Sequence, residues 1–222
     1  MLLSVPLQVI FAFCIALVLN ADIKGRSLFR TVFYLPTIVP AVASSIVWMM
    51  LFDPDTGFLN TILKAAGLPG SKWIYGESTA VPSLALMSLW TVGGTVVIFL
   101  AGLQNVPKEL YEAVEVDGGG WFSKLKAVTI PMVSPTIFFN LIMSFISSFQ
   151  VFSQAYIMTA GGPNNSTLFY VYYMYREAFQ YGNVGVASAL GWILFLIILV
   201  LTMIVFKSSA LWVFYDGEVK NK

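Results

Sequence analysis

The sequence predicts an all-α fold, that of a polytopic membrane protein, and three observations lead to this prediction. Of the 222 residues, 58% are hydrophobic and only 10% are charged. Soluble domains carry about 25% charged residues, so this chain has too little charge to cover a soluble surface. The mean hydropathy is +0.82. Apolar runs of about 20 residues, the length that a helix needs to cross the hydrocarbon core, also recur along the chain.

Five such runs are free of charged side chains, and each is an expected transmembrane helix. They cover residues 2–19, 31–52, 81–103, 136–159 and 184–206. The last run is the most apolar, because its fifteen Leu, Ile, Val and Phe residues contribute roughly −6 kcal/mol on the insertion scale. In the second run, Pro36 and Pro40 lie four residues apart and predict a kink.

Lys and Arg residues are distributed unevenly between the two sides that these helices define. Nine lie on one side and three on the other, and basic residues favour the cytoplasmic side. The loop of residues 105–131 and the C-terminus are therefore expected to be cytoplasmic. The nine are Lys24, Arg26, Arg30, Lys108, Lys124, Lys126, Lys207, Lys220 and Lys222, and the three are Lys64, Lys72 and Arg176.

The N-terminus leaves two alternatives open. With five spans and a cytoplasmic C-terminus, Met1 would lie outside the cell. Either an upstream helix is missing from this chain, or the protein has five helices and begins outside. The chain starts directly in apolar sequence without a basic segment, so a cleaved secretory signal is not expected.

Composition excludes several classes of function. A net charge of +1 and a pI of about 7.7 give no reason to expect a nucleic-acid partner. The chain has no histidine and one cysteine, which excludes a disulfide framework, a Cys/His zinc site and a histidine general base within it. Cys14 lies in an apolar run and is expected to be an inert packing residue.

Residues 105–131 form the long polar interruption between the third and fourth runs. Pro107 suits the start of a helix, and Leu110, Ala113 and Val114 share one of its faces. The glycines 118–120 would end this helix. A second helix over residues 121–128 would place Trp121, Leu125 and Val128 on one side and end before Pro131. This elbow is either a docking element or an interfacial helix that lies on the lipid headgroups.

The elbow resembles the EAA motif of ABC importer permeases in its sugar-transport form. The resemblance rests on Glu112-Ala113-Val114, Asp117-Gly118 and Thr129-Ile130-Pro131, with matching spacing. Residues 25–30, 34–36, 100–107 and 159–163 also resemble segments of this family, closest to its maltose-type carbohydrate group. Val114 and Gly119 stand where alanine is usual, and Leu125 stands where phenylalanine is common.

The resemblance implies a type I ABC importer permease fold, usually of six helices, with residues 1–222 as a single transmembrane permease domain. It implies that the elbow couples to a separate ATPase dimer. The expected coupling residues are Glu112, Ala113, Val114, Asp117, Gly118 and Gly119. Further expected partners are a second homologous permease, an extracytoplasmic solute-binding protein, a sugar and membrane lipid, in the cell membrane of a bacterium or archaeon. The chain has no phosphate-loop motif, so no cofactor is expected in it and ATP would bind the partner subunit.

Polar residues of the fourth run indicate a substrate path. Asn140, Ser144, Ser147 and Gln154 recur at offsets of 0, 4, 7 and 14, which is one face of a helix, and Gln150 adds an amide. Phe149, Phe152 and Tyr156 nearby could stack on a sugar. The alternative is a set of interhelical hydrogen bonds, each worth about 0.6 kcal/mol.

Two other classes of function compete with an importer subunit. An autonomous secondary carrier or channel would favour intramembrane charges or internal symmetry, and neither is visible in the sequence. A membrane-embedded enzyme would favour histidine, cysteine or paired carboxylates near the membrane. The sequence does not indicate which sugar is carried, or whether this chain or its sister permease holds the sugar.

Overall fold

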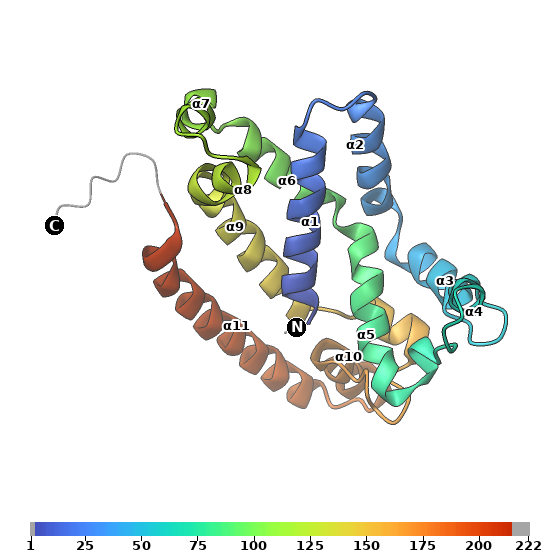
Figure 1. The fold of residues 1–222 in the computed structure, drawn as a ribbon. Coiled ribbons are helices and arrows are strands. Elements are labelled where there is room, and N and C mark those ends of the chain that lie inside the picture. Colours follow the sequence, from blue (N-terminus) through green and yellow to red (C-terminus); the bar gives the residue numbers. More distant parts are fainter. Residues whose placement is uncertain (1–2, 215–222) are drawn as a thin grey trace.

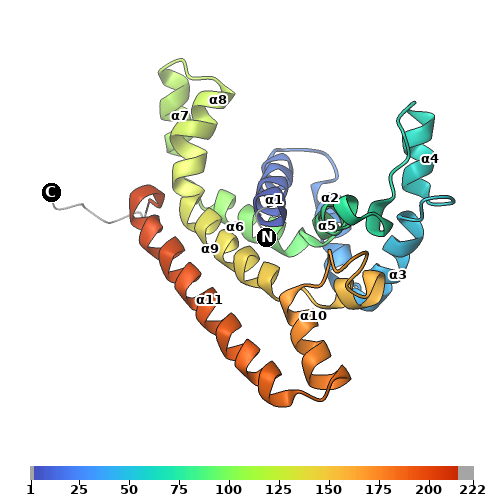
Figure 2. The ribbon, with the colours of Figure 1, turned by 90° about the horizontal axis from the view of Figure 1, so that it is seen from below.

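The computed structural model describes residues 3–214, and within that range the chain is built from helices joined by turns, without a β-strand. Figure 1 shows how the helices follow one another, and Figure 2 shows the same path from below. In both views α11 (Val184–Trp212) and α4 (Phe58–Ala65) lie at opposite sides of the molecule. The predicted all-α class is confirmed.

Three helices form the main apolar core: α1 (Ser4–Asn20), α6 (Gly93–Gln104) and α9 (Ile130–Phe149). Ala12 and Ala16 have no exposed surface, and these small side chains let α1 approach its neighbours closely. Phe99 on α6 is equally buried and meets the ring of Phe13 edge to face, with the centroids 5.3 Å apart. Aromatic pairs of this geometry contribute about 0.5–1.5 kcal/mol beyond the burial of their area.

Each of the five apolar runs contains a helix, but the helices differ in length from the predicted spans. Among the residues that the structure describes, two continuous helices of 29 residues are long and apolar enough to cross a membrane, 121–149 and 184–212. Two further spans are possible if each of two bent helix pairs counts as one. The first run corresponds to α1, an apolar helix of 17 residues. Leu2, part of that run, lies outside the described residues.

The second run is broken rather than kinked. It begins within α2 (Arg26–Tyr34) and continues through the short 3-10 helix η1 (Leu35–Ile38) and α3 (Ala41–Leu51). The segments before and after the break differ in direction by 101°. Val39 and Pro40 are extended at the break, because Pro40 lacks the N–H that would continue the helix. The third run bends by 52° between α5 (Glu77–Ser88) with η3 (Leu89–Thr91) and α6.

The predicted fourth span, residues 136–159, is wrong at both ends. Its helix already begins before residue 136 and ends at Phe149, where Gln150 leaves helical geometry with φ −102° and ψ 16°. A separate π-helical turn, η5 (Ala155–Thr159), follows after an irregular stretch. The break carries uncharged polar residues but no charged one, so the absence of charge made the run look like a single span.

The loop between α3 and α5 is held together by one buried side chain, Asn60 of α4. Its amide donates to the carbonyl oxygens of Pro54 and Ser71 and accepts from the N–H of Ser71 and the Nε1–H of Trp73, with distances of 2.8–2.9 Å. The loop also contains the 3-10 turn η2 (Trp73–Tyr75). Asn60 is only 2% exposed, so its full set of partners fixes the loop without leaving a buried polar atom unpaired.

The same loop begins with a turn around the Asp53 carboxylate. Hydrogen bonds from the backbone N–H and the hydroxyl of Thr56, and from the N–H of Asp55, lower the pKa of Asp53. These donors favour the charged carboxylate. The second loop at this end contains α10 (Tyr170–Tyr175) and the π-turn η6 (Arg176–Gln180).

Most of the basic residues that the sequence assigned to one side do share one end. In Figure 1 the connection between α1 and α2 lies toward the same end as α7 (Lys108–Val116) and α8 (Trp121–Lys124). Lys220 and Lys222 lie outside the described residues. Cys14 is exposed on α1, so the expectation that it is a packing residue is wrong.

Gly93 permits the contact between α2 and α6. A Cβ at this position would lie 2.3 Å from the carbonyl oxygen of Phe33, whereas a Cβ at Gly94 would meet nothing within 4 Å. We expect Gly93→Ala to destabilise the protein by about 1–3 kcal/mol, the usual cost of overpacking. Thermal unfolding of the detergent-solubilised protein measures this effect. Gly94→Ala is the matched control, and equal melting temperatures of the two variants would contradict the packing assignment.

Candidate functional site

The elbow between α6 and α9 is a helical hairpin closed by a glycine turn. After α7, the N–H of Gly119 donates to the carbonyl oxygen of Val114 at 2.8 Å, and the N–H of Gly118 donates to that of Glu115 at 2.9 Å. This pair of bonds defines a Schellman motif, in which the first residue after the C-cap must adopt the left-handed backbone conformation. Gly118 takes that conformation, with φ +77°. The predicted end of the first elbow helix at the glycines is confirmed.

Two side-chain contacts join the arms of the hairpin. The Lys124 ammonium lies 3.1 Å from a carboxylate oxygen of Glu115, and the hydroxyls of Tyr111 and Thr129 lie 3.2 Å apart. An exposed ion pair contributes little to stability. The hairpin therefore depends more on its glycine turn and on its packing against the helical core than on this pair.

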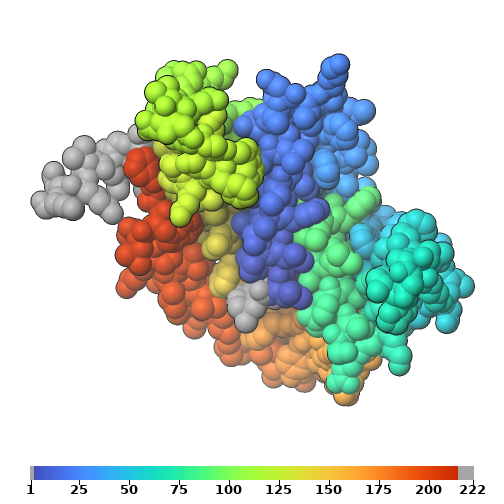
Figure 3. Space-filling model, in the orientation of Figure 1, coloured from blue at the N-terminus to red at the C-terminus, as the bar shows by residue number. Residues whose placement is uncertain are grey.

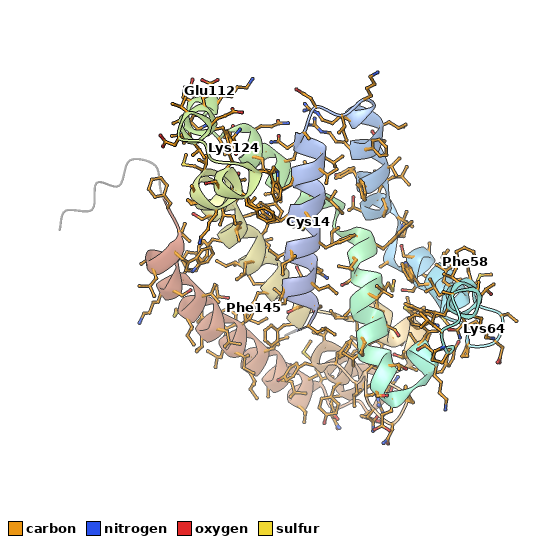
Figure 4. All side chains as sticks on the ribbon, viewed as in Figure 1. Cys14, Phe58, Lys64, Glu112, Lys124 and Phe145 are labelled. Atoms are coloured by element: carbon orange, nitrogen blue, oxygen red, sulfur yellow. The ribbon has the colours of Figure 1, made fainter. Side chains whose placement is uncertain are left out.

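The elbow has an inner and an outer side. Tyr111 and Val114 pack against the core of α1, α6 and α9. Most of the other expected coupling residues are more exposed, and the sticks of Figure 4 place Glu112 at the outer edge of the elbow, on α7. Exposed residues of the sequence-predicted set are Glu112, Ala113, Asp117 and Gly118, while Val114 and Gly119 are half-buried. Leu110 is exposed too, so the predicted face of Leu110, Ala113 and Val114 is only partly covered.

The outer side of the elbow also carries large apolar side chains. Val116 is 87% exposed, Phe122 79% and Trp121 62%. The rings of Trp121 and Phe122 pack edge to face, with centroids 4.9 Å apart. Figure 3 shows the elbow standing out from the body of the molecule. Apolar side chains gathered on a projecting hairpin indicate a surface that another molecule covers.

The second arm of the elbow continues without interruption into α9. The π-turn η4 (Leu125–Thr129) links α8 to α9, and the combined helix covers residues 121–149. The prediction that Pro131 ends the elbow is therefore wrong. Pro131 stands in the first turn of α9, directly after the π-turn, where its missing N–H disturbs the helix least.

Val114 and Gly119, two departures from the family pattern, are in contact with one another. A Cβ at Gly119 would lie 2.5 Å from Cγ1 of Val114 and 2.8 Å from its carbonyl oxygen. Both the side chain and the backbone of Val114 thus occupy the space that a side chain at position 119 would need.

A second candidate site is a cavity of about 650 Å³ at the opposite end of α9 from the elbow. It is bounded by the start of α1, the break between η1 and α3, α5, η3, the end of α9 and the start of α10. None of the described residues that line it is charged. Its polar lining consists of Ser4, Gln8, Thr37, Ser44, Ser88, Thr91, Ser147, Ser148, Gln150, Gln154 and Tyr170.

The structure brings together only part of the predicted substrate path. Ser147, Gln150 and Gln154 line the cavity, whereas Asn140 and Ser144 do not. Asn140 is 2% exposed and its Nδ2 has no hydrogen-bond partner. The helical offsets used to join these residues are wrong for Gln154, because α9 ends before it.

The sequence prediction missed the polar side chains of other helices that complete the cavity wall. Ser44 lies in the second apolar run, whereas Ser88 and Thr91 lie in the third, so no periodicity within one run connects all three. Gln8 had a visible signal, because it is the one amide within the first run. Within residues 3–214, no three acidic, cysteine or histidine residues gather where they could hold a metal ion.

The aromatic residues expected beside the path divide between two places. Phe149 lines the cavity. Phe152 and Tyr156 are stacked on each other, with centroids 5.4 Å apart and ring planes 11° apart, and they contact Tyr172 and Tyr175. Phe152 borders a separate apolar groove of about 490 Å³ between α10 and α11.

Comparison with known proteins gives a family match over most of the chain. The family model described as "Binding-protein-dependent transport system inner membrane component" matches residues 6–212. The chain is 40% identical to the probable ABC transporter permease protein YesP of Bacillus subtilis, over 98% of this chain and 71% of that protein. It is 31% identical to the trehalose/maltose transport system permease protein MalF of Thermococcus litoralis, over 92% and 69%.

A solved structure shares the fold. A chain in the crystal structure of a bacterial alginate ABC transporter, in complex with an alginate pentasaccharide-bound periplasmic protein, superposes with a TM-score of 0.82. It is 23% identical and the match covers 93% of this chain and 73% of that one. A third relative by sequence is the arabinooligosaccharides transport system permease protein AraP of Bacillus subtilis, 32% identical over 88% of this chain and 64% of that protein.

Two equally buried asparagines allow a comparison of how an unpaired and a fully paired amide affect the stability of the protein. Asn140 has an unpaired Nδ2 in the closed core, whereas the amide of Asn60 is fully bonded. We expect Asn140→Leu to raise the thermal stability, because an unpaired buried polar group costs about 1–3 kcal/mol. Asn60→Leu should lower it. Thermal unfolding in detergent measures both, and a large loss of stability in Asn140→Leu would show that the amide has a partner after all.

Proposed function

Because this chain belongs to the family of binding-protein-dependent transport system inner membrane components, we propose that it is a permease subunit of an ATP-driven importer for sugars. Relatives over nearly its whole length are described as permeases for arabinooligosaccharides, for trehalose and maltose, and for diacetylchitobiose. The observation that carries the proposal is the projecting elbow with its EAA-like residues, rooted in the core and continuous with a helix that reaches a polar cavity.

The elbow is the proposed docking site for a separate ATPase subunit. The exposed backbone at Ala113 and Gly118 permits close approach, and Val116, Trp121 and Phe122 provide apolar surface to bury. Glu112 supplies a polar contact on the outer edge of α7. ATP would bind to that partner and no cofactor to this chain. A second permease and an extracytoplasmic binding protein complete the proposed assembly, which sits in a bacterial or archaeal cell membrane.

The cavity is the proposed contact between this chain and the sugar. A volume of about 650 Å³ lies within the range of small-molecule sites, about 300–1,000 Å³. Its amides and hydroxyls can exchange hydrogen bonds with sugar hydroxyls, and the absence of charge among the lining residues favours an uncharged solute. Ser147, Gln150 and Gln154 keep the role that the sequence proposed for them.

The combined helix 121–149 is the proposed lever between the two sites. It has 29 residues and therefore spans roughly 43 Å at 1.5 Å per residue. Its first turn belongs to the elbow, and Ser147 and Ser148 near its end line the cavity. ATP-driven movement of the elbow would be transmitted along this helix as a rigid-body motion.

Co-purification and uptake test the proposed function. The tagged protein, expressed with the neighbouring genes of its operon, should retain an ATPase subunit in mild detergent. Vesicles containing the assembly should accumulate a labelled oligosaccharide only with ATP and the binding protein. Uptake that persists without any ATPase would instead favour an autonomous carrier.

The orientation can be tested by labelling single cysteines in a Cys14→Ala background. We expect a membrane-impermeant maleimide to label Phe58→Cys in intact cells, and Val116→Cys only after the cells are made permeable. Both positions are well exposed, Phe58 at 62% and Val116 at 87%, so access to the reagent decides the result. Labelling of Val116→Cys from outside would reverse the proposed topology, including the cytoplasmic C-terminus.

Coupling can be tested at two glycines of the elbow. Gly118→Val should abolish most ATP-driven uptake, because a side chain in the left-handed region costs about 1–2 kcal/mol and would deform the turn. Gly120→Val is the matched control, since Gly120 has φ −80° and a Cβ there meets nothing within 4 Å. Glu112→Lys should also reduce uptake while leaving membrane insertion unchanged. Uptake, ATP hydrolysis and membrane abundance are measured together, and normal uptake by Gly118→Val would count against the docking role.

A further inference from the structure

The hydroxyl of Ser44 differs from five other hydroxyls of the cavity wall, which all donate to backbone carbonyl oxygens. In apolar surroundings, a helical Ser or Thr usually bonds to a carbonyl oxygen one turn earlier. Ser88 donates to Ala85 at 2.5 Å and Ser148 donates to Phe145 at 2.7 Å. Thr37, Thr91 and Tyr170 also donate to backbone carbonyls. Ser44 is 5% exposed and its Oγ has no partner.

The next residue along α3 makes the contrast sharper. Ser45 has no exposed surface, and its hydroxyl donates to the carbonyl oxygen of Ala41 at 2.7 Å. Ser44 lies on the cavity wall and leaves its donor unused, whereas Ser45 lies away from the cavity and is satisfied within the helix. A buried donor without a partner is costly, so its presence at a cavity wall points to a ligand that supplies the acceptor.

Ser44 also lies in the first turn of a helix that begins at the cavity. The chain breaks at Val39 and Pro40, and α3 starts at Ala41 without a side-chain cap. Val39, Ala41 and Ser44 all line the cavity. The first amides of a helix have no partner within it and carry partial positive charge. Broken membrane helices use such ends to hold electronegative groups of a substrate.

We propose that the first turn of α3, with the Ser44 hydroxyl as donor, binds a hydroxyl oxygen of an uncharged sugar unit during its passage. This inference rests on the proposed function and assigns part of the sugar contact to the broken second span, in addition to α9. A hydroxyl oxygen suits the site better than a carboxylate, because none of the described lining residues is a cation that would balance a desolvated charge.

The test compares sugars and variants in the assembled importer, with the binding protein saturating. Uptake is measured for maltose, trehalose, arabinotriose, diacetylchitobiose and an acidic alginate trisaccharide. For the best neutral substrate, each monodeoxy derivative is then measured with wild type, Ser44→Ala, Ser44→Thr and Ser45→Ala. All variants are measured with the same derivatives and the same binding protein. The ratio of the uptake rates of two variants for one derivative therefore reports on the contact with this chain alone.

We expect Ser44→Ala to lower the uptake rate of the parent sugar about fivefold, the effect of one hydrogen bond. For this variant, removal of one particular sugar hydroxyl should then lower the uptake rate no further. The uptake rate of wild type should fall by about the same factor when the parent sugar is replaced by the derivative that lacks this hydroxyl. Ser44→Thr should restore both the rate and the sensitivity, and Ser45→Ala should behave as wild type. A purely structural defect would lower uptake of every derivative alike.

Three results would overturn the inference. Ser44→Ala could show the wild-type pattern with all derivatives, or it could lose uptake equally with all of them. Dependence on Ser44 could also appear only with the alginate trisaccharide, which would make the group a carboxylate. If wild type takes up none of the five sugars, the proposed function itself fails, and this inference fails with it. Uptake of the alginate trisaccharide alone overturns the inference and leaves the proposed function standing. Both outcomes are recognised before any variant is measured.

Discussion

The constraint on which this structure depends is that polar groups between apolar helices must find their partners inside the protein. Many side-chain hydroxyls of the chain meet it by donating to backbone carbonyl oxygens about one turn earlier. Ser134 shows how far this goes, since its hydroxyl donates to the carbonyl oxygen of Pro131 at 2.6 Å and accepts from the N–H of Phe214 at 2.8 Å. One serine thereby joins the start of α9 to the end of α11.

The same constraint decides where the chain can be irregular. Both breaks in the apolar runs, at Pro40 and after Phe149, border the polar cavity, where a backbone group can meet water or a solute. The region nearer the elbow contains the continuous core of α1, α6 and α9. The π-turn at residues 125–129 keeps the elbow and α9 in one helix despite Pro131. Continuous helices thus lie where the proposed lever would transmit motion, and irregular structure lies where the proposed cavity would receive a sugar.

Local signals in the sequence predicted the elbow well, and they predicted the cavity poorly. The glycine turn needs only neighbouring residues, so Gly118 and the end of α7 followed from the pattern. The cavity joins residues from separate runs, among them Gln8, Ser44 and Gln154. Hydropathy treats a run as one straight helix, so it could not locate the breaks that bring these residues together.

Asn140 and Ser44 show why an unpaired polar group has to be interpreted by its surroundings. Both are almost fully buried, and each has a hydrogen-bonding atom without a partner. Asn140 does not border the cavity, so nothing in the described structure can reach its Nδ2, and the group only lowers stability. Ser44 belongs to the cavity wall, so an acceptor can enter and recover the lost bond. An unpaired donor thus only lowers stability at Asn140, whereas at Ser44 it can contribute to binding selectivity. A solute that lacks the matching acceptor would leave the Ser44 hydroxyl unpaired and bind less well.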